Sequence, residues 1–375
     1  MESTILKEYA KEGIGIVERV VGRSSTLPAL SSILVTAEKN TLEFAATDLE
    51  IGIRYKVLAK NKQDGQTVIP SRFLSSLLGF LPDSQVTFKA HGSTFHVEAK
   101  NHTSEVKTMD PDEFPIIPAP EQKEIAIEVE AQPFCRGLAQ VSGFSSQSQT
   151  RPELTGVFFS FLSKELRMAA TDSFRLAEKI FMFTKENKQE HQIILPGKAV
   201  RELISILSER TGRVKIYVSG HQAAFEYIAG DNASSPQIQI ISRLIEGEYP
   251  PYREVIPTTH STKVVVEKAQ FLNQIKASAI FTGKKEEVRL TCDPSKKGVT
   301  ITSKSPDLGE SESFLQGKVE GEKMAISFNW RFLAEGLAQI KGGEVQLLLN
   351  GEEGPALLVP TEEEQYRYVI MPIKA

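Results

Sequence analysis

The sequence is poor in cysteine and in long apolar segments. Only Cys135 and Cys292 occur among the 375 residues, which excludes the disulfide framework of a small secreted domain. No run of about 18 uninterrupted apolar residues exists, so no membrane-spanning helix is predicted. The first residues also lack the apolar core of a signal peptide. Together these features predict a cytoplasmic protein.

An excess of charge of one sign is also lacking. The 44 Lys and Arg residues face 48 Asp and Glu residues, for a net charge of −4, so the chain is not coated in basic charge for wrapping nucleic acid. Any nucleic-acid surface is therefore expected to be local. With 40% hydrophobic and 25% charged residues the composition is that of an ordinary folded protein. At about 150 residues per domain, the length predicts two or three domains.

Signatures of catalysis or of a bound cofactor are missing as well. The six histidines are scattered without metal-ligand spacing. Gly13–Gly15 lacks the third glycine of a dinucleotide-binding loop, and Gly283–Lys285 lacks the upstream glycine and the Ser or Thr of a phosphate loop. Asp48 and Asp172 each end an Ala-Ala-Thr-Asp segment, and the two segments are 124 residues apart. We therefore expect the two aspartates to lie in separate domains, where they shape turns and do not form an acid–base pair. The sequence predicts a protein that is not an enzyme and has no metal or cofactor.

An internal repeat is present instead. The segment Ala45–Ile51 recurs as Ala169–Leu176, with Thr47 and Thr171 separated by 124 residues. Each copy is followed by an apolar segment that ends in a proline, Pro70 or Pro196, and continues as a helical pattern. We expect these prolines at the first helical position, where no backbone hydrogen bond is lost. A third copy at Ile326–Leu333 lacks the proline.

Each third of the chain shows the same order of an amphipathic helix, strands, a second helix and more strands. In the first third, apolar residues recur at helical spacing over Leu6–Val21 and again over Phe73–Leu81. Between them the period changes to two, which suits strands covered on one face. The pattern predicts an α+β fold with two helices on an antiparallel sheet, repeated three times. The predicted domains are residues 1–122, 123–256 and 257–375, with linkers at Pro118–Lys123 and Pro257–Ser261.

Six segments distributed over the whole chain carry a resemblance to a known family. They are Thr26–Leu30, Thr47–Glu50, Asp112–Pro115, Ala170–Ala177, Tyr249–Arg253 and Tyr368–Ile373. Through them the sequence resembles the bacterial DNA sliding clamps, the β subunits of the DNA polymerase III holoenzyme. The resemblance implies a head-to-tail homodimer whose six similar DNA-clamp domains form a ring, with helices lining the hole and sheets outside.

The resemblance also implies a function in DNA replication. Such a clamp is a processivity factor that encircles double-stranded DNA without sequence specificity and tethers the replicative DNA polymerase. It also binds the clamp loader and other replication and repair proteins. A head-to-tail contact closes into a ring only when its rotation divides a full turn, and a closed ring stays on DNA by topology, without base contacts. The alternative left open is a non-catalytic protein-binding scaffold that does not encircle DNA.

Basic residues on the expected helices are candidates for the surface facing DNA. They are Lys7, Lys11, Arg72, Arg136, Lys198, Arg201, Lys268, Lys276, Arg331 and Lys341. Arg72 and Lys198 match family positions that contact DNA, and two loops resemble DNA-touching loops. These loops contain Arg23 and Ser24, and Gln147, Gln149 and Arg151. Taken singly, each of these side chains is equally well explained as an ordinary solvated group.

The resemblance implies two further surfaces. A hydrophobic partner-peptide pocket would be lined by Leu154, Thr171, Ser173, Phe174, Arg175, Leu176, Pro250, Val255, Val369, Met371, Pro372, Ile373 and Lys374. Its apolar walls suit burial and its methionine suits varied partners, although Leu176, Val255 and Val369 are also explained as plain core. A dimer interface would bring Val106 against Ile280 and Phe281, which are equally explained as the end of a helix that begins near Lys268.

Overall fold

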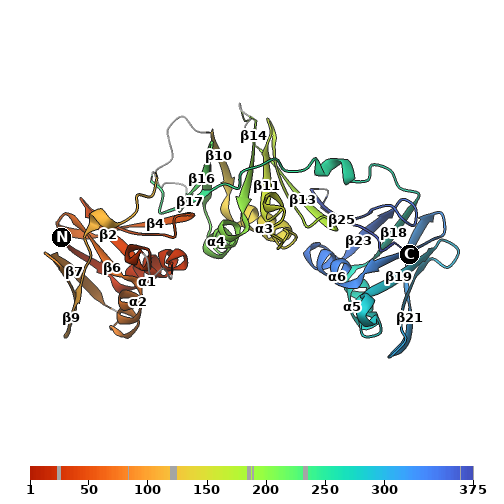
Figure 1. Cartoon of the computed structure of the whole chain (residues 1–375), viewed down its shortest axis with the longest axis horizontal. Helices are drawn as coiled ribbons and strands as arrows, with labels where there is room; N and C mark the ends of the chain where they lie inside the picture. The colour runs from red at the N-terminus through yellow and green to blue at the C-terminus, as the bar shows by residue number, and fades with distance from the viewer. Residues whose placement is uncertain are drawn as a thin grey trace. The chain divides into compact units, whose positions relative to one another are not determined.

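A computed structural model describes residues 1–22, 27–82, 84–118, 125–183, 187, 190–230, 235–363 and 365–374 of the chain (Figure 1). Contacts between residues divide it into two compact units. The first consists of Met1–Arg136 and Lys198–Leu244, and the second of Gly137–Gly197 and Ile245–Ala375. The helices are α1 (Lys7–Val17), α2 (Ser71–Phe80), α3 (Ala131–Ser142), α4 (Gly197–Leu207), α5 (Lys268–Ala279) and α6 (Trp330–Gln339).

The first unit contains two antiparallel sheets. The smaller has the order β5 (Lys60–Gln63), β1 (Glu2–Leu6), β7 (Gln85–His91), β8 (Thr94–Ala99) and β9 (His102–Lys107). The larger has the order β10 (Ile125–Glu130), β15 (Arg213–Ser219), β16 (Gln222–Ile228), β17 (Ile238–Arg243), β4 (Ile51–Leu58), β3 (Thr41–Thr47), β2 (Ser32–Glu38) and β6 (Gly65–Pro70). Because β17 pairs with β4, strands from the first and middle thirds form one sheet.

The second unit has twelve hydrogen-bonded strands in one sequence of neighbours. Their order is β14 (His191–Pro196), β11 (Gly156–Phe161), β12 (Glu165–Thr171), β13 (Arg175–Met182), β25 (Tyr366–Ile370), β24 (Ala356–Pro360), β23 (Glu344–Leu349), β18 (Thr262–Glu267), β21 (Gly309–Gly321), β20 (Gly298–Ser305), β19 (Glu287–Asp293) and β22 (Met324–Asn329). The β13–β25 pair joins the middle and last thirds, just as the β4–β17 pair joins the first and middle thirds.

The three thirds repeat one hydrogen bond at the start of their first helix. The backbone N–H of Lys7 donates to the carbonyl of Ser84 (3.0 Å), that of Ala131 to Gly212 (2.9 Å), and that of Lys268 to Gly343 (2.8 Å). Each bond ties the start of one helix to the segment that follows the second helix of the same third. The predicted α+β fold of three tandem domains, each with two helices on antiparallel strands, is confirmed. Its boundaries at 122/123 and 256/257 remain predictions.

Two of the lysines expected to face DNA donate hydrogen bonds within these helix pairs. The Nζ of Lys7, whose residue is only 8% exposed, donates to the carbonyl oxygen of Leu81, and the Nζ of Lys268 donates to that of Ile340 at 2.8 Å. Both carbonyls follow the last turn of the second helix, where no intrahelical partner remains. Each of these lysines therefore caps its neighbouring helix, and the expectation that they face DNA stays a prediction.

The prolines at the strand-to-helix junctions are also displaced from the predicted position. Pro70 is the last residue of β6 and Pro196 the last of β14, and the helices begin one residue later. Pro70 is still paired opposite Ser32, because an edge strand tolerates proline. In the third repeat Asn329 replaces the proline, and its side chain accepts the N–H of Arg331 (2.9 Å) as an N-cap.

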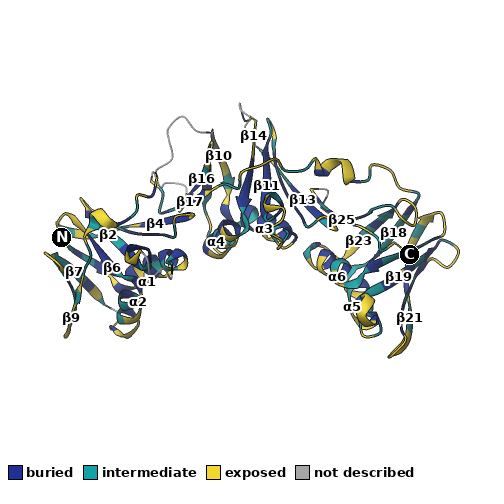
Figure 2. Cartoon of the chain, in the orientation of Figure 1, coloured by how far each residue is buried: buried dark blue, intermediate teal, exposed yellow. Residues whose placement is uncertain are grey.

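Burial follows the strand and helix periods. Figure 2 shows the strands dark blue over much of their length, and the buried faces carry large side chains such as Phe44, Phe88 and Phe159. Two residues of the predicted first-helix stripe, Leu6 and Tyr9, are each 42% exposed. Among the described residues the longest helices have 12 residues, too few for a membrane crossing, which needs about 20.

Candidate functional site

The repeated Thr-Asp motif of the second unit forms a turn between β12 and β13. The hydroxyl of Thr171 donates to the carbonyl of Arg175 (2.6 Å) and accepts the N–H of Ser173 (3.1 Å). The carboxylate of Asp172 accepts the N–H groups of Phe174 (3.0 Å) and Arg175 (3.1 Å). These side-chain bonds hold Ser173 in the left-handed region with φ 77°, a conformation that costs an ordinary residue about 1–2 kcal/mol.

The first unit contains the same turn between β3 and β4. Thr47 donates to the carbonyl of Ile51 (2.9 Å) and accepts the N–H of Leu49 (3.0 Å), which has φ 76°. Asp48 accepts the N–H groups of Glu50 (3.0 Å) and Ile51 (2.7 Å). The prediction that Asp48 and its equivalent shape turns is confirmed, and both carboxylates are committed to backbone groups.

Arg175 is enclosed by partners within the second unit. Its Nε donates to Asp172 Oδ2 at 2.9 Å, and its Nη1 forms an ion pair with Glu335 on α6. The guanidinium carbon lies 4.4 Å from the ring centroid of Phe332 and 5.1 Å from that of Phe144. With only 11% of the side chain exposed, Arg175 fastens the turn to α6.

The carboxyl-terminal tail runs past the same turn. The N–H of Met371 donates to the carbonyl of Phe174 (2.9 Å), and the N–H of Ile373 donates to that of Ser327 within β22 (2.8 Å). The tail is thereby fixed between a turn of the middle third and a strand of the last third. Phe174 itself is 61% exposed and lies 6.3 Å, centroid to centroid, from Phe332.

An aromatic cluster lies beneath the connector that follows β17. Tyr249 stacks on Phe158 with centroids 4.7 Å apart, and Tyr252 meets Phe158 edge-on at 5.8 Å. Leu176 of β13 and Val369 of β25 are buried in the same cluster. The connector and the carboxyl-terminal strand therefore share one small core.

All thirteen residues predicted for the peptide pocket lie in the second unit. Leu154, Thr171, Leu176 and Val369 are buried, Arg175, Pro250, Pro372 and Ile373 are half-buried, and Ser173, Phe174, Val255, Met371 and Lys374 are exposed. The core interpretation holds for Leu176 and Val369, which are 3% and 2% exposed, but not for Val255, which is 49% exposed. Hydrogen bonds and ring contacts connect the turn, the tail and the connector into one region.

The predicted DNA-contacting residues are divided between the units. In the first unit Arg72 on α2 and Arg201 on α4 are exposed, whereas Lys198 forms an ion pair with Asp48. In the second unit Gln147, Gln149 and Arg151 are exposed on the loop before η4 (Pro152–Leu154). Arg23 and Ser24 lie outside the described residues.

The loop residue Arg151 is paired with an acid two residues away. Its Nε donates to Glu153 Oε1 at 2.9 Å. The pKa of the Glu153 carboxyl is lowered by a backbone hydrogen bond and by Arg151. Part of the positive charge of Arg151 is thus already balanced within the loop.

Of the predicted dimer-interface residues, Val106 lies on an edge strand and the other two lie at the end of a helix. Over the described ranges β9, which carries the half-buried Val106, pairs only with β8. The first part of β21 pairs only with β20 in the same ranges. Ile280 and Phe281 directly follow α5, as the helix-end interpretation expects, yet Ile280 is 68% exposed.

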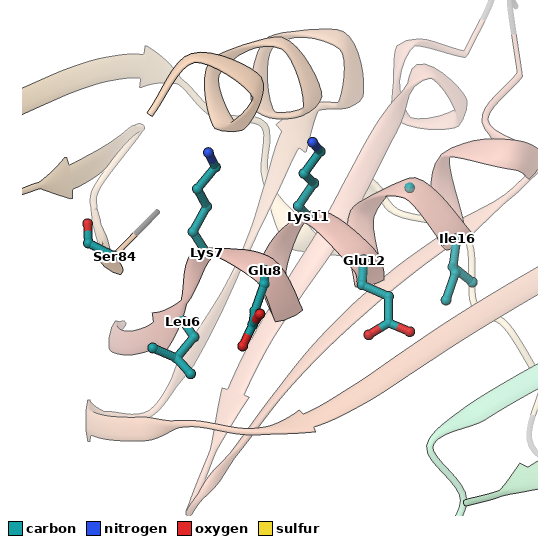
Figure 3. Close-up of a pocket in the computed structure, with 8 residues that line it drawn as sticks. Leu6, Lys7, Glu8, Lys11, Glu12, Ile16 and Ser84 are labelled. Carbon is teal, nitrogen blue, oxygen red and sulfur yellow. The ribbon is translucent and has the colours of Figure 1, made fainter. Parts of the chain in front are cut away.

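A surface cavity of about 720 Å³ lies along α1 (Figure 3). Its lining includes Lys7, Glu8, Lys11 and Glu12, and Figure 3 shows the two lysines extending to one side of the helix and the two glutamates to the other. Glu12 is already bonded to Tyr55 and Arg210. This mixture of charges does not define a ligand.

The described residues offer no signature of catalysis. No group of three or more His, Cys, Asp or Glu residues within those ranges is placed to hold a metal ion. Cys135 and Cys292 are both buried, and burial raises the pKa of each thiol to about 12. Since the thiolate is the reactive form, these cysteines are inert at neutral pH.

Three family models together match nearly the whole chain. They describe the N-terminal domain of the DNA polymerase III beta subunit at residues 1–118, its central domain at 128–251 and its C-terminal domain at 253–374. The chain belongs to the bacterial β sliding clamp family. Members of this family are non-catalytic processivity factors of DNA replication, and this is the function of the chain.

Individual β sliding clamps agree with this assignment. Curated relatives from Staphylococcus epidermidis and Bacillus subtilis are 27% and 26% identical; both alignments cover 100% of this chain, and 99% and 100% of the relative. A crystal structure of the B. subtilis clamp has a TM-score of 0.91 at 25% identity, with 100% and 99% coverage. A Pseudomonas aeruginosa clamp bound to griselimycin has a TM-score of 0.92 at 25% identity, with full coverage of both chains.

Sequence reasoning missed several residues of these surfaces. Glu335 and Phe332, which enclose Arg175, are far from it in sequence and carry no motif of their own.

Proposed function

We propose that two copies of this clamp close head to tail into a ring around duplex DNA. The observation that carries the proposal is the pair of strand edges in one chain, β9 in the first unit and the first part of β21 in the second, which are unpaired within the described ranges. Exposed edges attract further strands. Pairing β9 of one copy with β21 of the next satisfies both edges, and two such contacts close a ring.

Side chains near these edges are complementary. Val106, Ile280 and Phe281 supply the apolar centre of the interface. Lys107 on β9 and Glu310 and Glu312 on β21 are exposed and of opposite charge. An apolar centre with charged residues around it is typical of a specific interface.

The solution mass tests the ring directly. The wild-type chain of 41.5 kDa is expected to have twice that mass, and the double variant Ile280→Asp, Phe281→Asp is expected to have the mass of one chain with unchanged circular dichroism. Leu58→Asp is the matched control, because Leu58 is a comparably exposed apolar residue outside the proposed interface. A wild-type monomer, or a double variant that remains dimeric, contradicts the proposal.

DNA is proposed to be held by charge and topology. Arg72, Lys198 and Arg201 of the first unit, Arg23 and Ser24 of the undescribed segment, and Gln147, Gln149 and Arg151 of the second unit are the proposed contacts. Lysine and arginine contacts to phosphates weaken as salt rises, so exchanging Arg72 and Arg201 for Ala should reduce the salt dependence of binding. A protein-binding scaffold without encirclement would bind neither circular nor linear DNA.

The thirteen pocket residues are proposed to receive peptide segments of the replicative polymerase, the clamp loader and repair proteins. Griselimycin, bound to the P. aeruginosa clamp, is the proposed probe for the same surface. Titration calorimetry should show binding to the wild type and a loss of at least tenfold in Val255→Asp. Ile116→Asp is the matched control, because Ile116 is an exposed apolar residue in a loop of the first unit. Equal losses in both variants contradict the assignment.

The domain boundaries remain part of the proposal. Residues 1–122, 123–256 and 257–375 are proposed as the three clamp domains. The family-model matches end or begin within ten residues of these boundaries, and the linker Pro257–Ser261 is a loop in the second unit.

A further inference from the structure

We propose that Glu178 is a positioning residue for the peptide pocket, because its buried carboxylate holds both the connector and the carboxyl-terminal strand. The inference rests on the proposed partner-binding function of that region. Glu178 lies on β13 and is 1% exposed. A fully buried carboxylate is costly unless it is paired and hydrogen-bonded, so its partners indicate its role.

The first partner of Glu178 belongs to the connector. The hydroxyl of Tyr252 donates to Glu178 Oε1 at 2.8 Å, and both residues are buried. Tyr252 begins η5 (Tyr252–Val255), the short helix that ends with the exposed Val255. A tyrosine hydroxyl is protonated at neutral pH and can donate, and burial, followed by the nearby charge of Glu178, raises the pKa of Tyr252 above its usual range.

The second partner belongs to the strand that leads into the tail. Arg367 on β25 stands directly opposite Glu178 in the β13–β25 register. Its Nη1 lies 3.4 Å from Glu178 Oε2. Four residues later the backbone N–H of Met371 bonds to the carbonyl of Phe174. One carboxylate therefore contacts two segments that each supply proposed pocket residues, Val255 on one and Met371 on the other.

The first unit provides an independent comparison. Arg54 occupies the position equivalent to Glu178, seven residues after the Thr of the repeated turn, and its Nη2 donates to the carbonyl of Ile117 at 2.5 Å. Ile117 belongs to the connector that follows the first domain, and it packs in the core cluster of that junction. The same strand position therefore holds the connector in both units, through a cation in one and an anion in the other.

Arg54 and Glu178 differ in what they require of the segments that they hold. Arg54 holds a backbone carbonyl, which any connector sequence supplies. Glu178 requires a tyrosine hydroxyl and an arginine, so the positions of the connector and the strand are linked through one charge. When one partner is removed, a buried carboxylate is left with the other alone, and both segments are expected to loosen.

Hydrogen exchange on the free protein tests this linkage without any ligand. In Tyr252→Phe, the amides of Met371 and Ile373 should exchange about tenfold faster than in the wild type, in addition to those of Glu254 and Ile256. In Arg367→Met, the amides of Glu254 and Ile256 should also exchange faster. Tyr366→Phe is the matched control, because it removes another buried hydroxyl bond from β25, to the carbonyl of Gln140 at 3.4 Å.

Griselimycin affinity gives the functional readout. Tyr252→Phe and Glu178→Ala should weaken binding about tenfold. Glu178→Gln should lose less affinity than Glu178→Ala, because its side-chain oxygen still accepts the tyrosine hydroxyl although the charge that pairs with Arg367 is gone, and Tyr366→Phe should bind as the wild type does. Faster exchange confined to the segment of the mutated residue, or equal affinities for Tyr252→Phe and Tyr366→Phe, would overturn the inference. If the two variants show the linked exchange but the wild type does not bind griselimycin, the linkage is supported and the proposed pocket is refuted.

Discussion

The turn after β3 and the turn after β12 have the same backbone and different surroundings. In both, a threonine and an aspartate make the same four hydrogen bonds, and the third residue has a positive φ. The first turn continues with Glu50 and the second with Phe174, which is 61% exposed. The connectors, in contrast, both carry apolar residues that pack in a junction core, Phe114 and Ile117 in the first and Tyr252 and Ile256 in the second. The two repeats share the backbone conformation of the turn, while a few side chains determine whether the surface around it is apolar.

The largest expected difference concerns the cation beside each turn. Arg175→Met should lower the free energy of unfolding by about 2–4 kcal/mol, because it leaves Asp172 and Glu335 without their mostly buried partner. Lys198→Met, beside Asp48, should cost about 0–1 kcal/mol, since Lys198 is half exposed. Urea unfolding monitored by circular dichroism measures both. Equal losses in the free energy of unfolding would show that Arg175 stabilises the second turn no more than Lys198 stabilises the first.

The aspartates allow a sharper comparison. Asp48→Ala and Asp172→Ala should each cost about 1–2 kcal/mol, because each removes two bonds to backbone N–H groups. Only Asp172→Ala should reduce griselimycin affinity, since Asp172 also holds Arg175. A similar loss of affinity in Asp48→Ala would remove the distinction between the turns.

Alkaline pH should weaken the second connector through its two tyrosines. Burial raises the pKa of both Tyr249 and Tyr252, so their stabilising contribution is present below the ordinary tyrosine pKa of about 10 and is lost as pH rises above it. Each adds about 1.4 kcal/mol per pH unit to the decline in the free energy of unfolding. Thermal unfolding between pH 9 and 11.5 should show a shallower decline in the Tyr249→Phe, Tyr252→Phe double variant. An unchanged slope would contradict this account.

The smallest expected effect is shared by both turns. Leu49→Gly and Ser173→Gly should each stabilise the protein by about 0.5–1 kcal/mol, because glycine adopts a positive φ without the steric cost. The gain is reduced by the greater freedom of glycine in the unfolded chain. Melting temperatures of the two variants should rise together. A rise in only one of them would show that the two backbones are not equivalent.

The sequence predicted the parts of this molecule that depend on local patterns. The repeat around Thr47 and Thr171 predicted two equivalent turns, and the change from helical to strand periodicity predicted three α+β domains. It did not predict the position of Pro70, because pairing with Ser32 extends β6 by one residue. It did not predict that Lys7 and Lys268 cap neighbouring helices, because a lysine that caps a helix looks in sequence like any exposed cation. Glu178 was missed because Arg367 is 189 residues away.

Retention on DNA tests the central claim most directly. The protein, a clamp loader and ATP are incubated with nicked circular DNA, the salt is raised to release proteins held by charge alone, and the DNA is then cut once. The account predicts that the protein stays on the circle and leaves the linear product. Equal retention on circular and linear DNA, or no retention on the circle, would contradict a ring held by topology.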